Sequence, residues 1–261
     1  MTVTQEPSTY PELFSLTGRR AVVTGAGKGI GREIATALAE AGAHVIVAEL
    51  DKALGQQAAA ELVAAGGSAE AHSLDVTDGR AVEEFAAAVG AIDILVNNAG
   101  VAYIEPPLET TDEGWAKTMD VNCNAAFWCS RAFGRRMAEQ GSGSIVNVGS
   151  ICGQVVTRPQ NSVAYMTSKG AIHMMTKSMA TDLAPRNVRV NAVAPGYVET
   201  AMTQEVRRNA PEMLDAWVSG TPMGRLARPA EVAAAVLFLA SDASSYCTGS
   251  VLNVDGGYTA W

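Results

Sequence analysis

The chain has 261 residues, a mass of 27.1 kDa, 48% hydrophobic residues and a formal net charge of −8. This length and hydrophobic content predict one large domain with a sizeable core, and they exclude an intrinsically disordered chain. The acidic balance and the lack of a lysine- or arginine-rich block argue against binding to nucleic acid or an acidic membrane, and no apolar run has transmembrane length.

The cysteine pattern indicates the redox environment. The chain contains no C-x-x-C pair and no histidines clustered near its four cysteines, which are Cys123, Cys129, Cys152 and Cys247. We therefore predict reduced thiols in a cytoplasmic protein and no metal site. No secretory signal segment is expected at the N-terminus.

The first regular elements follow a polar N-terminal stretch. Residues 1–14 contain two prolines and no hydrophobic periodicity, which predicts a flexible arm ahead of a domain over residues 15–261. A buried strand is expected over 20–24, followed by a glycine-rich turn, an alanine-rich helix over 32–41 and a second strand over 44–49. This order is the βαβ unit typical of a dinucleotide site.

The glycine-rich turn has the spacing Gly25-x-x-x-Gly29-x-Gly31, which differs from the G-x-G-x-x-G pattern. Residues without a Cβ permit positive φ and let the backbone approach a pyrophosphate. The free N–H groups and the dipole of the following helix favour that anion. The predicted cofactor contacts in this turn are Gly25, Lys28, Gly29, Ile30 and Gly31.

Glu49, at the end of the second strand, indicates which dinucleotide is used. A carboxylate there can accept hydrogen bonds from both adenosine ribose hydroxyls and would repel a 2′-phosphate, which favours NAD over NADP. Lys28 favours NADP instead, but Glu49 carries more weight because it would face the phosphate in a partly desolvated site. The alternative is that Glu49 is only a solvated acid at a strand end.

Helices and strands continue to alternate along the chain. Helices are predicted over residues 51–65, 77–89, 114–140, 163–183 and 231–239. Strands are predicted over residues 69–74, 92–96, 144–150, 188–194 and 250–254. The pattern predicts an α/β fold: a single-domain, Rossmann-type, doubly wound parallel sheet of about seven strands with helices on both faces.

Polar residues gather where the predicted strands end. Asp75, Asn98 and the Pro195-Gly196 pair follow three of these strands, and Ser150 ends a fourth, in addition to the glycine turn and Glu49. Ligands of such sheets bind beyond the carboxyl ends of the strands. We therefore expect one site along this edge of the sheet.

A tyrosine and a lysine on the helix over 163–183 suggest a proton carrier. Tyr165 and Lys169 are four residues apart and share one face of that helix. An ammonium beside a phenol favours phenolate, so we expect Lys169 to lower the pKa of Tyr165 toward neutral pH. The alternative is a half-buried tyrosine beside a lysine that extends to solvent.

In combination, these motifs resemble those of the short-chain dehydrogenase/reductase family over residues 15–261. The motifs are Thr24 with the glycine turn, Asn97-Asn98-Ala99-Gly100, Asn122, Ser150, Tyr165-x-x-x-Lys169 and Pro195-Gly196. The resemblance implies a Rossmann-type domain, a nicotinamide cofactor, a small-molecule substrate and a homotetramer.

The resemblance also implies roles for individual residues. Tyr165 would act as acid and base, Ser150 would hydrogen-bond the substrate oxygen, and Lys169 would hold the nicotinamide ribose. Asn122 would anchor a water that links Lys169 to solvent. Further cofactor contacts would come from Asp75, Val76, Asn98, Ala99, Gly100, Pro195, Gly196, Val198 and Thr200. Ser150 could instead be a strand-end cap, and Asn122 a helix residue bonded to its own backbone.

Several stretches outside the shared motifs resemble the polyol-oxidising branch of this family. They are residues 158–160, 169–173, 195–200, 221–225 and 255–259 together with Trp261. The resemblance implies oxidation of a secondary hydroxyl in a sugar alcohol or vicinal diol. A polyol needs polar partners in a dry pocket, and the candidates are Cys152, Gln154, Thr157, Gln160, Asn161 and Tyr197. The alternative is that they are surface loop residues.

Residues 197–224 form the longest irregular stretch, and a helix-like apolar pattern covers 205–219. A mobile lid over the pocket is one interpretation, and an ordinary packed helix or oligomer contact is the other. Tyr258 and Trp261 suggest burial at a subunit interface.

Two other functions remain open. One is an NAD(P)H-dependent reductase of ketones or 3-oxoacyl thioesters, against which the acidic stretch Ala138-Glu139-Gln140 counts. The other is a non-enzymatic dinucleotide sensor, against which the intact Ser150, Tyr165 and Lys169 count.

Overall fold

A computed structural model of the chain describes residues 9–261. Seven strands form one parallel sheet in the order β3-β2-β1-β4-β5-β6-β7. The strands are β1 (Arg20–Thr24), β2 (His44–Glu49), β3 (Ser68–Ser73), β4 (Ile94–Asn97), β5 (Gly143–Val148), β6 (Val188–Pro195) and β7 (Val251–Val254). The predicted seven-stranded parallel sheet is confirmed. Among residues 9–261, no helix combines the length and apolar content that a membrane span requires.

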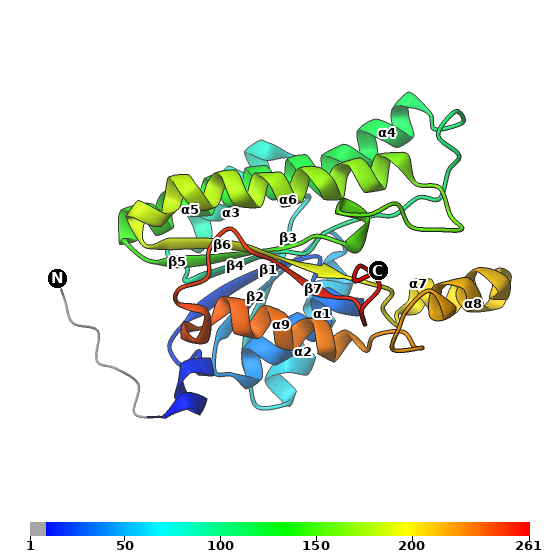
Figure 1. Cartoon of the computed structure of the whole chain (residues 1–261). Coiled ribbons are helices and arrows are strands. Elements are labelled where there is room, and N and C mark those ends of the chain that lie inside the picture. The colour runs from blue at the N-terminus through cyan, green and yellow to red at the C-terminus, as the bar shows by residue number, and fades with distance from the viewer. Residues whose placement is uncertain (1–8) are drawn as a thin grey trace.

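Helices cover both faces of the sheet (Figure 1). One layer contains α1 (Gly29–Glu40), α2 (Lys52–Ala64) and α9 (Pro229–Ala240). The other contains α3 (Gly79–Val89), α5 (Ala125–Gln140) and α6 (Val163–Leu183). Along β2, Val45 and Val47 pack into the core under the first layer, whereas Ile46 and Ala48 pack into the core under the second. Because both faces are covered, the central strands contain continuous apolar runs, such as residues 21–23 of β1 and 94–96 of β4, rather than alternating apolar and polar residues.

The N-terminal arm was predicted over residues 1–14, of which 1–8 lie outside the described residues. Within the rest of the predicted arm, Tyr10–Phe14 form the 3₁₀ helix η1. The centroid of the Phe14 ring lies 6.5 Å from that of the Phe238 ring of α9. Phe14 follows both prolines of the predicted arm. Its contact with α9 places the end of that arm against the domain.

The prediction of one continuous helix over 114–140 is wrong. The structure has α4 (Asp112–Met119), then a π-helical turn over Asp120–Asn124, then α5. The side chain of Asn122 in this turn bonds both backbone groups of Val101, with Oδ1 accepting at 2.8 Å and Nδ2 donating at 2.9 Å. These contacts are made outside the helix, so the helical pattern of the sequence does not reveal the turn.

The helix-like pattern over 205–219 corresponds to two helices, α7 (Ala201–Asn209) and α8 (Pro211–Ser219). The break falls at Ala210, which has φ −149° and ψ 62°. Proline disfavours a helical conformation in the residue before it and supplies no N–H of its own, so Pro211 begins a new helix. Both helices lie beyond the end of the sheet at which β6 ends (Figure 1).

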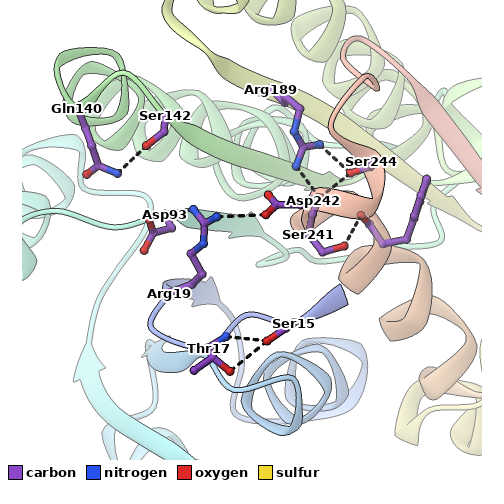
Figure 2. A network of polar contacts seen from close by, with 11 residues as sticks. Ser15, Thr17, Arg19, Asp93, Gln140, Ser142, Arg189, Ser241, Asp242 and Ser244 are labelled. Atoms are coloured by element: carbon purple, nitrogen blue, oxygen red, sulfur yellow. Dashed lines mark hydrogen bonds and ion pairs between the residues drawn. The ribbon is translucent and has the colours of Figure 1, made fainter. Parts of the chain in front are cut away.

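The opposite edge of the sheet is held by a polar cluster (Figure 2). Arg189, near the start of β6, donates to Leu239 O at 2.9 Å, Ser244 Oγ at 2.8 Å and Ser241 O at 3.0 Å. These acceptors include carbonyls at the C-terminus of α9, where a cation is favoured. Arg19 lies 3.4 Å from Asp242 and 3.6 Å from Asp93. The cluster joins β6, β1 and the end of α9 away from the loops that carry the candidate site.

Candidate active site

The loop between β1 and α1 is shaped by close backbone approaches. Gly25 has φ +62° and Gly29 has φ +60°, conformations that favour glycine. A Cβ on Gly25 would lie 2.9 Å from Ala99 Cα, so the loop packs directly on the chain that follows β4. Asn98 Nδ2 fixes this packing by donating to Thr24 O at 2.9 Å and Gly25 O at 3.0 Å.

The same loop fits the pyrophosphate of a dinucleotide. A Cβ on Gly29 would meet nothing within 4 Å. The N-cap residue of α1, Lys28, makes no side-chain capping bond, so the first N–H groups of the helix have no side-chain cap. Ile30, the other residue predicted in this loop, packs partly buried against the core below.

The Glu49 carboxylate lies against this loop rather than in open solvent. Gly27 N donates to Glu49 Oε2 at 3.0 Å, and Asp51 N approaches Oε1 at 3.3 Å. A Cβ on Gly27 would lie 2.9 Å from the same Oε2 atom, so glycine is needed for the contact. The acid is therefore positioned beside the loop that would hold the pyrophosphate.

Ser150, Tyr165 and Lys169 come together at the end of β5. Ser150 is 6% exposed, and its Oγ accepts from Cys152 N at 3.1 Å while the hydroxyl also hydrogen-bonds the Tyr165 phenol. Lys169 Nζ lies 5.6 Å from the centroid of the Tyr165 ring and donates to Val148 O at 2.8 Å. The three side chains thus form one contiguous group from β5 and α6.

Burial dominates the electrostatics of this group. It raises the pKa of the Tyr165 phenol, as does the nearby Cys152 thiol, and the hydrogen bond from Ser150 opposes that shift. Burial also lowers the pKa of Lys169 from 10.5 to about 8. The expected fall in the pKa of Tyr165 is therefore wrong in direction. Desolvation of the phenol outweighs the cation, whose Nζ is directed at Val148 O.

Asn122 bonds tertiary partners rather than its own helix. Besides the two bonds to Val101, its Nδ2 lies 3.1 Å from Ser168 Oγ, and Ser168 Oγ donates to Tyr165 O at 2.7 Å. The π-helical turn is therefore tied to the first turn of α6. A π-helical turn inside a helix frequently marks a functional site.

The remaining predicted cofactor residues follow β3, β4 and β6. Asp75 Oδ1 accepts from Thr77 N at 2.9 Å and from Thr77 Oγ1 at 2.6 Å, and Val76 packs against the core beneath α3 and α5. A Cβ on Gly100 would lie 3.3 Å from Asn122 Oδ1 and 3.7 Å from Lys169 Nζ. Gly100 therefore links the turn after β4 to the group containing Tyr165.

The segment after β6 also lies at this edge. Pro195 ends the strand, and Gly196 N donates to Val254 O at 3.0 Å. Val198 is buried, and Thr200 begins α7 with its N–H donating to Thr203 Oγ1 at 2.8 Å.

Four of the six substrate candidates form a connected network with a residue of α8. Gln160 Nε2 donates to Thr157 Oγ1 and to Tyr197 OH, both at 3.0 Å, and Cys152 Sγ lies 3.4 Å from Thr157 Oγ1. Trp217 Nε1 donates to Gln160 Oε1 at 2.8 Å, and its ring stacks on Tyr197 with centroids 4.4 Å apart. We call these five residues the Gln160 network.

Gln154 and Asn161 lie outside the Gln160 network. Gln154 makes two hydrogen bonds with Asn253: its Nε2 donates to Asn253 Oδ1 at 2.8 Å, and its Oε1 accepts from Asn253 Nδ2 at 3.1 Å. Gln154 lines a cavity of about 410 Å³ whose lining contains no catalytic candidate; its other lining residues are Gly153, Gly170, His173, Met174, Lys177 and Val251. Asn161 is exposed, and its backbone oxygen accepts from Glu105 N at 3.1 Å.

Three residues at the site were not predicted as site residues. Trp217 was predicted only as part of the apolar helical pattern over 205–219. Ser168 precedes Lys169 in the sequence and was given no role. The buried Thr24 accepts at Oγ1 from Asn98 N at 3.0 Å and Ala99 N at 3.1 Å. Their position inside or next to a motif was the only available signal, because their partners are distant in the sequence.

A parallel seven-stranded sheet with a glycine turn after β1 and a Tyr–Lys pair at the same edge is the arrangement of a Rossmann-type dinucleotide-binding protein. Comparison with known proteins agrees with this class. A family model described as enoyl-(acyl carrier protein) reductase matches residues 25–259. The chain is 51% identical to galactitol 2-dehydrogenase (L-tagatose-forming) of Cereibacter sphaeroides, over 97% of this chain and 99% of that protein. The chain belongs to the short-chain dehydrogenase/reductase family.

Solved structures give the same assignment. The crystal structure of gox2181 has a TM-score of 0.95 and 44% identity, and the match covers 97% of this chain and 100% of that one. A gluconate 5-dehydrogenase described as putative and NAD(P)-dependent, from Beutenbergia cavernae with bound NADP, has a TM-score of 0.90 and 42% identity over 95% of this chain and 100% of its own. The predicted enzyme class, a dehydrogenase/reductase that interconverts a secondary alcohol and a ketone, is confirmed.

Proposed function

We propose that this enzyme oxidises a secondary hydroxyl of a sugar alcohol or another vicinal diol to the ketone, with NAD as cofactor. The observation that carries the proposal is the juxtaposition of Ser150, Tyr165 and Lys169 with the polar Gln160 network. A polyol needs hydrogen-bond partners near the reacting carbon, because a hydroxyl left unpaired in a dry pocket costs free energy. The relative named galactitol 2-dehydrogenase supports the same class of substrate.

In the proposed mechanism, the nicotinamide supplies the hydride acceptor, and this chain positions the substrate and moves the proton. Ser150 holds the substrate oxygen. Because burial keeps the Tyr165 phenol protonated, its oxygen takes the substrate proton as its own proton leaves toward the neutral amine of Lys169. Lys169, whose pKa is lowered to about 8 by burial, can accept and release a proton near neutral pH. Asn122 keeps the π-helical turn against α6 and would anchor the water that connects Lys169 to solvent.

The loop after β1 and the segments after β3, β4 and β6 would hold the dinucleotide. We assign the pyrophosphate to the turn at Gly29 and the adenosine ribose to Glu49. The carboxylate is held beside the loop by Gly27 N, where its charge opposes a 2′-phosphate. This placement supports NAD, although the Beutenbergia cavernae structure contains NADP.

We further propose a cytoplasmic homotetramer with residues 197–224 as a lid. Trp115 on α4 and Phe127 on α5 are 40% and 42% exposed, which is typical of apolar side chains that a neighbouring subunit covers. All four cysteines are free, as expected in a reducing compartment. Trp217 on α8 supports the lid, because it contacts Gln160 directly.

The test is a cofactor-reduction assay with a panel of polyols and with NAD or NADP. We expect NAD-linked oxidation of polyols or vicinal diols. Reduction of an acetoacetyl thioester alone would indicate a thioester reductase, and binding of cofactor without any turnover would indicate a sensor.

The Tyr165→Phe variant tests the proton carrier in the same assay. It should bind the cofactor with unchanged affinity, because the ring is retained, and lose turnover by about two to four orders of magnitude. Near-wild-type rates in this variant would reject the role of Tyr165.

A further inference from the structure

Both side-chain N–H groups of Gln160 donate hydrogen bonds within the protein. Its Oε1 accepts from Trp217 Nε1 at 2.8 Å, and its Nε2 donates both hydrogens, one to Thr157 Oγ1 and one to Tyr197 OH. The side chain is partly buried between the segment before α6, the segment after β6 and helix α8. Gln160 therefore has no N–H left to offer to a substrate.

The partner on α8 determines the orientation of this amide. An indole N–H can only donate, so the amide atom that faces Trp217 must be the oxygen. The NH₂ group must then face Thr157 and Tyr197. Each of these hydroxyl oxygens acts as an acceptor toward Gln160, and each keeps its own proton for another partner.

The two hydroxyls have different neighbours. The Tyr197 hydroxyl interacts with Tyr258, whose ring lies 5.5 Å away at 82°, and this interaction adds to the rise in the pKa of Tyr197 that burial causes. Besides Gln160, the Thr157 hydroxyl has Cys152 Sγ at 3.4 Å as its polar neighbour among residues 9–261. Because sulfur is a weak acceptor, the Thr157 proton is the one that a substrate oxygen can best satisfy.

Thr157 is also close to the catalytic group. It is 1% exposed, and its neighbour Cys152 donates its backbone N–H to Ser150 Oγ at 3.1 Å. The Cys152 side chain interacts electrostatically with Tyr165, Lys169 and Tyr197. Cys152 therefore connects the Thr157 hydroxyl to Ser150, which would hold the substrate oxygen.

We propose that Trp217 acts through Gln160 to set Thr157 as a hydrogen-bond donor to a second oxygen of the substrate, next to the reacting hydroxyl. This inference rests on the proposed function and deepens it. Thr157 is the specificity-determining contact, and Gln160 and Trp217 are positioning residues. A vicinal hydroxyl satisfies the donor, whereas an alcohol with a single hydroxyl leaves it unpaired in a dry site.

The test compares 2,3-butanediol with 2-butanol, which differ by one hydroxyl. Gln160→Glu keeps the side-chain shape and still accepts from Trp217, but its other oxygen can only accept, so it draws the Thr157 proton away from the substrate. We expect the KM for the diol to rise about tenfold, the free-energy equivalent of one hydrogen bond, while the KM for 2-butanol changes less than about twofold. Thr157→Val should give the same selective loss.

Two further variants separate orientation from packing. Trp217→Phe keeps the stack on Tyr197 but removes the N–H, so the amide can turn and the diol should lose affinity by a smaller factor than in Gln160→Glu. Trp115→Phe, at a partly exposed position on α4, is the matched control and should leave both KM values unchanged.

The wild-type enzyme and the variants answer different questions. Failure of the wild type to oxidise any diol or polyol would reject the proposed function. The inference itself is decided by the ratio of affinities for the diol and for 2-butanol. This ratio is also measured as binding of each alcohol to the NADH-loaded protein by intrinsic fluorescence, because the reduced cofactor cannot accept a hydride and no turnover occurs. An equal change for both alcohols in Gln160→Glu and Thr157→Val would overturn it.

Discussion

The buried ammonium of Lys169 should make the stability of the fold depend on pH in a particular direction. Lys169 is 5% exposed, and burial lowers its pKa from 10.5 to about 8. Between these two values the unfolded chain binds more protons at this position than the folded chain, so this contribution to folding stability increases with pH. At 1.36 kcal/mol for each pH unit, the fall in pKa corresponds to about 3 kcal/mol.

The comparison is between wild type and Lys169→Met, which keeps the length of the side chain and removes its charge. Loss of the bond to Val148 O lowers the stability of the variant by an amount that does not depend on pH. The difference in unfolding free energy between the two proteins should therefore shift by roughly 3 kcal/mol in favour of wild type from pH 7.5 to pH 10.5.

Urea unfolding followed by circular dichroism measures both proteins at each pH, and the contributions of groups that do not interact with Lys169 cancel in the difference. A difference that stays constant across this window would show that Lys169 titrates as in the unfolded chain. The assigned role as a proton acceptor near neutral pH would then lose its basis.

Three further substitutions test other parts of the structure. Glu49→Ser should raise the ratio of kcat/KM with NADP to that with NAD by at least about tenfold, since one full charge beside the 2′-phosphate is removed; an unchanged ratio would contradict the assignment. Arg189→Met should lower the free energy of unfolding by about 2–4 kcal/mol, because it removes the charge-assisted hydrogen bonds to Leu239 O, Ser241 O and Ser244 Oγ, with Arg189→Lys intermediate in thermal unfolding. Gly31→Ala should abolish cofactor binding, measured by calorimetry, because its Cβ would clash with Asn98 Nδ2 and Gly25 O; wild-type affinity would show that the loop adapts.

The sheet and the polar edge were predictable because their signals are local. Apolar runs such as that of β1 indicate buried strands, and the glycine spacing after it indicates a turn with particular backbone angles. Tyr165 and Lys169 were found because one turn of helix separates them. Helix caps are local features as well: Asp51 accepts from the backbone at the start of α2, and Asp78 does the same for α3.

Features that depend on distant partners were not predictable. The direction of the pKa shift of Tyr165 depends on how much of the chain buries it, which the Tyr-x-x-x-Lys spacing does not contain. The bond between Trp217 and Gln160 spans 57 positions, and no periodicity indicates it. The break between α7 and α8, by contrast, had a local signal in Pro211. The apolar pattern on both sides of this proline led to the prediction of one helix, and the break was missed.

The π-helical turn at Asp120–Asn124 has a consequence for how this chain tolerates changes in length. Such a turn contains one residue more than the α-helical turn that it replaces. Deletion of a single residue there would let α4 and α5 merge into one uninterrupted helix, and local hydrogen bonding would favour the shorter chain. The same deletion would rotate everything on one side of it by about 100° about the helix axis, carrying Asn122 away from Val101 and Ser168. A change that strengthens the helix would thus misalign the candidate site, so we expect the number of residues in this helix to be constrained by the contacts of Asn122 rather than by helix stability.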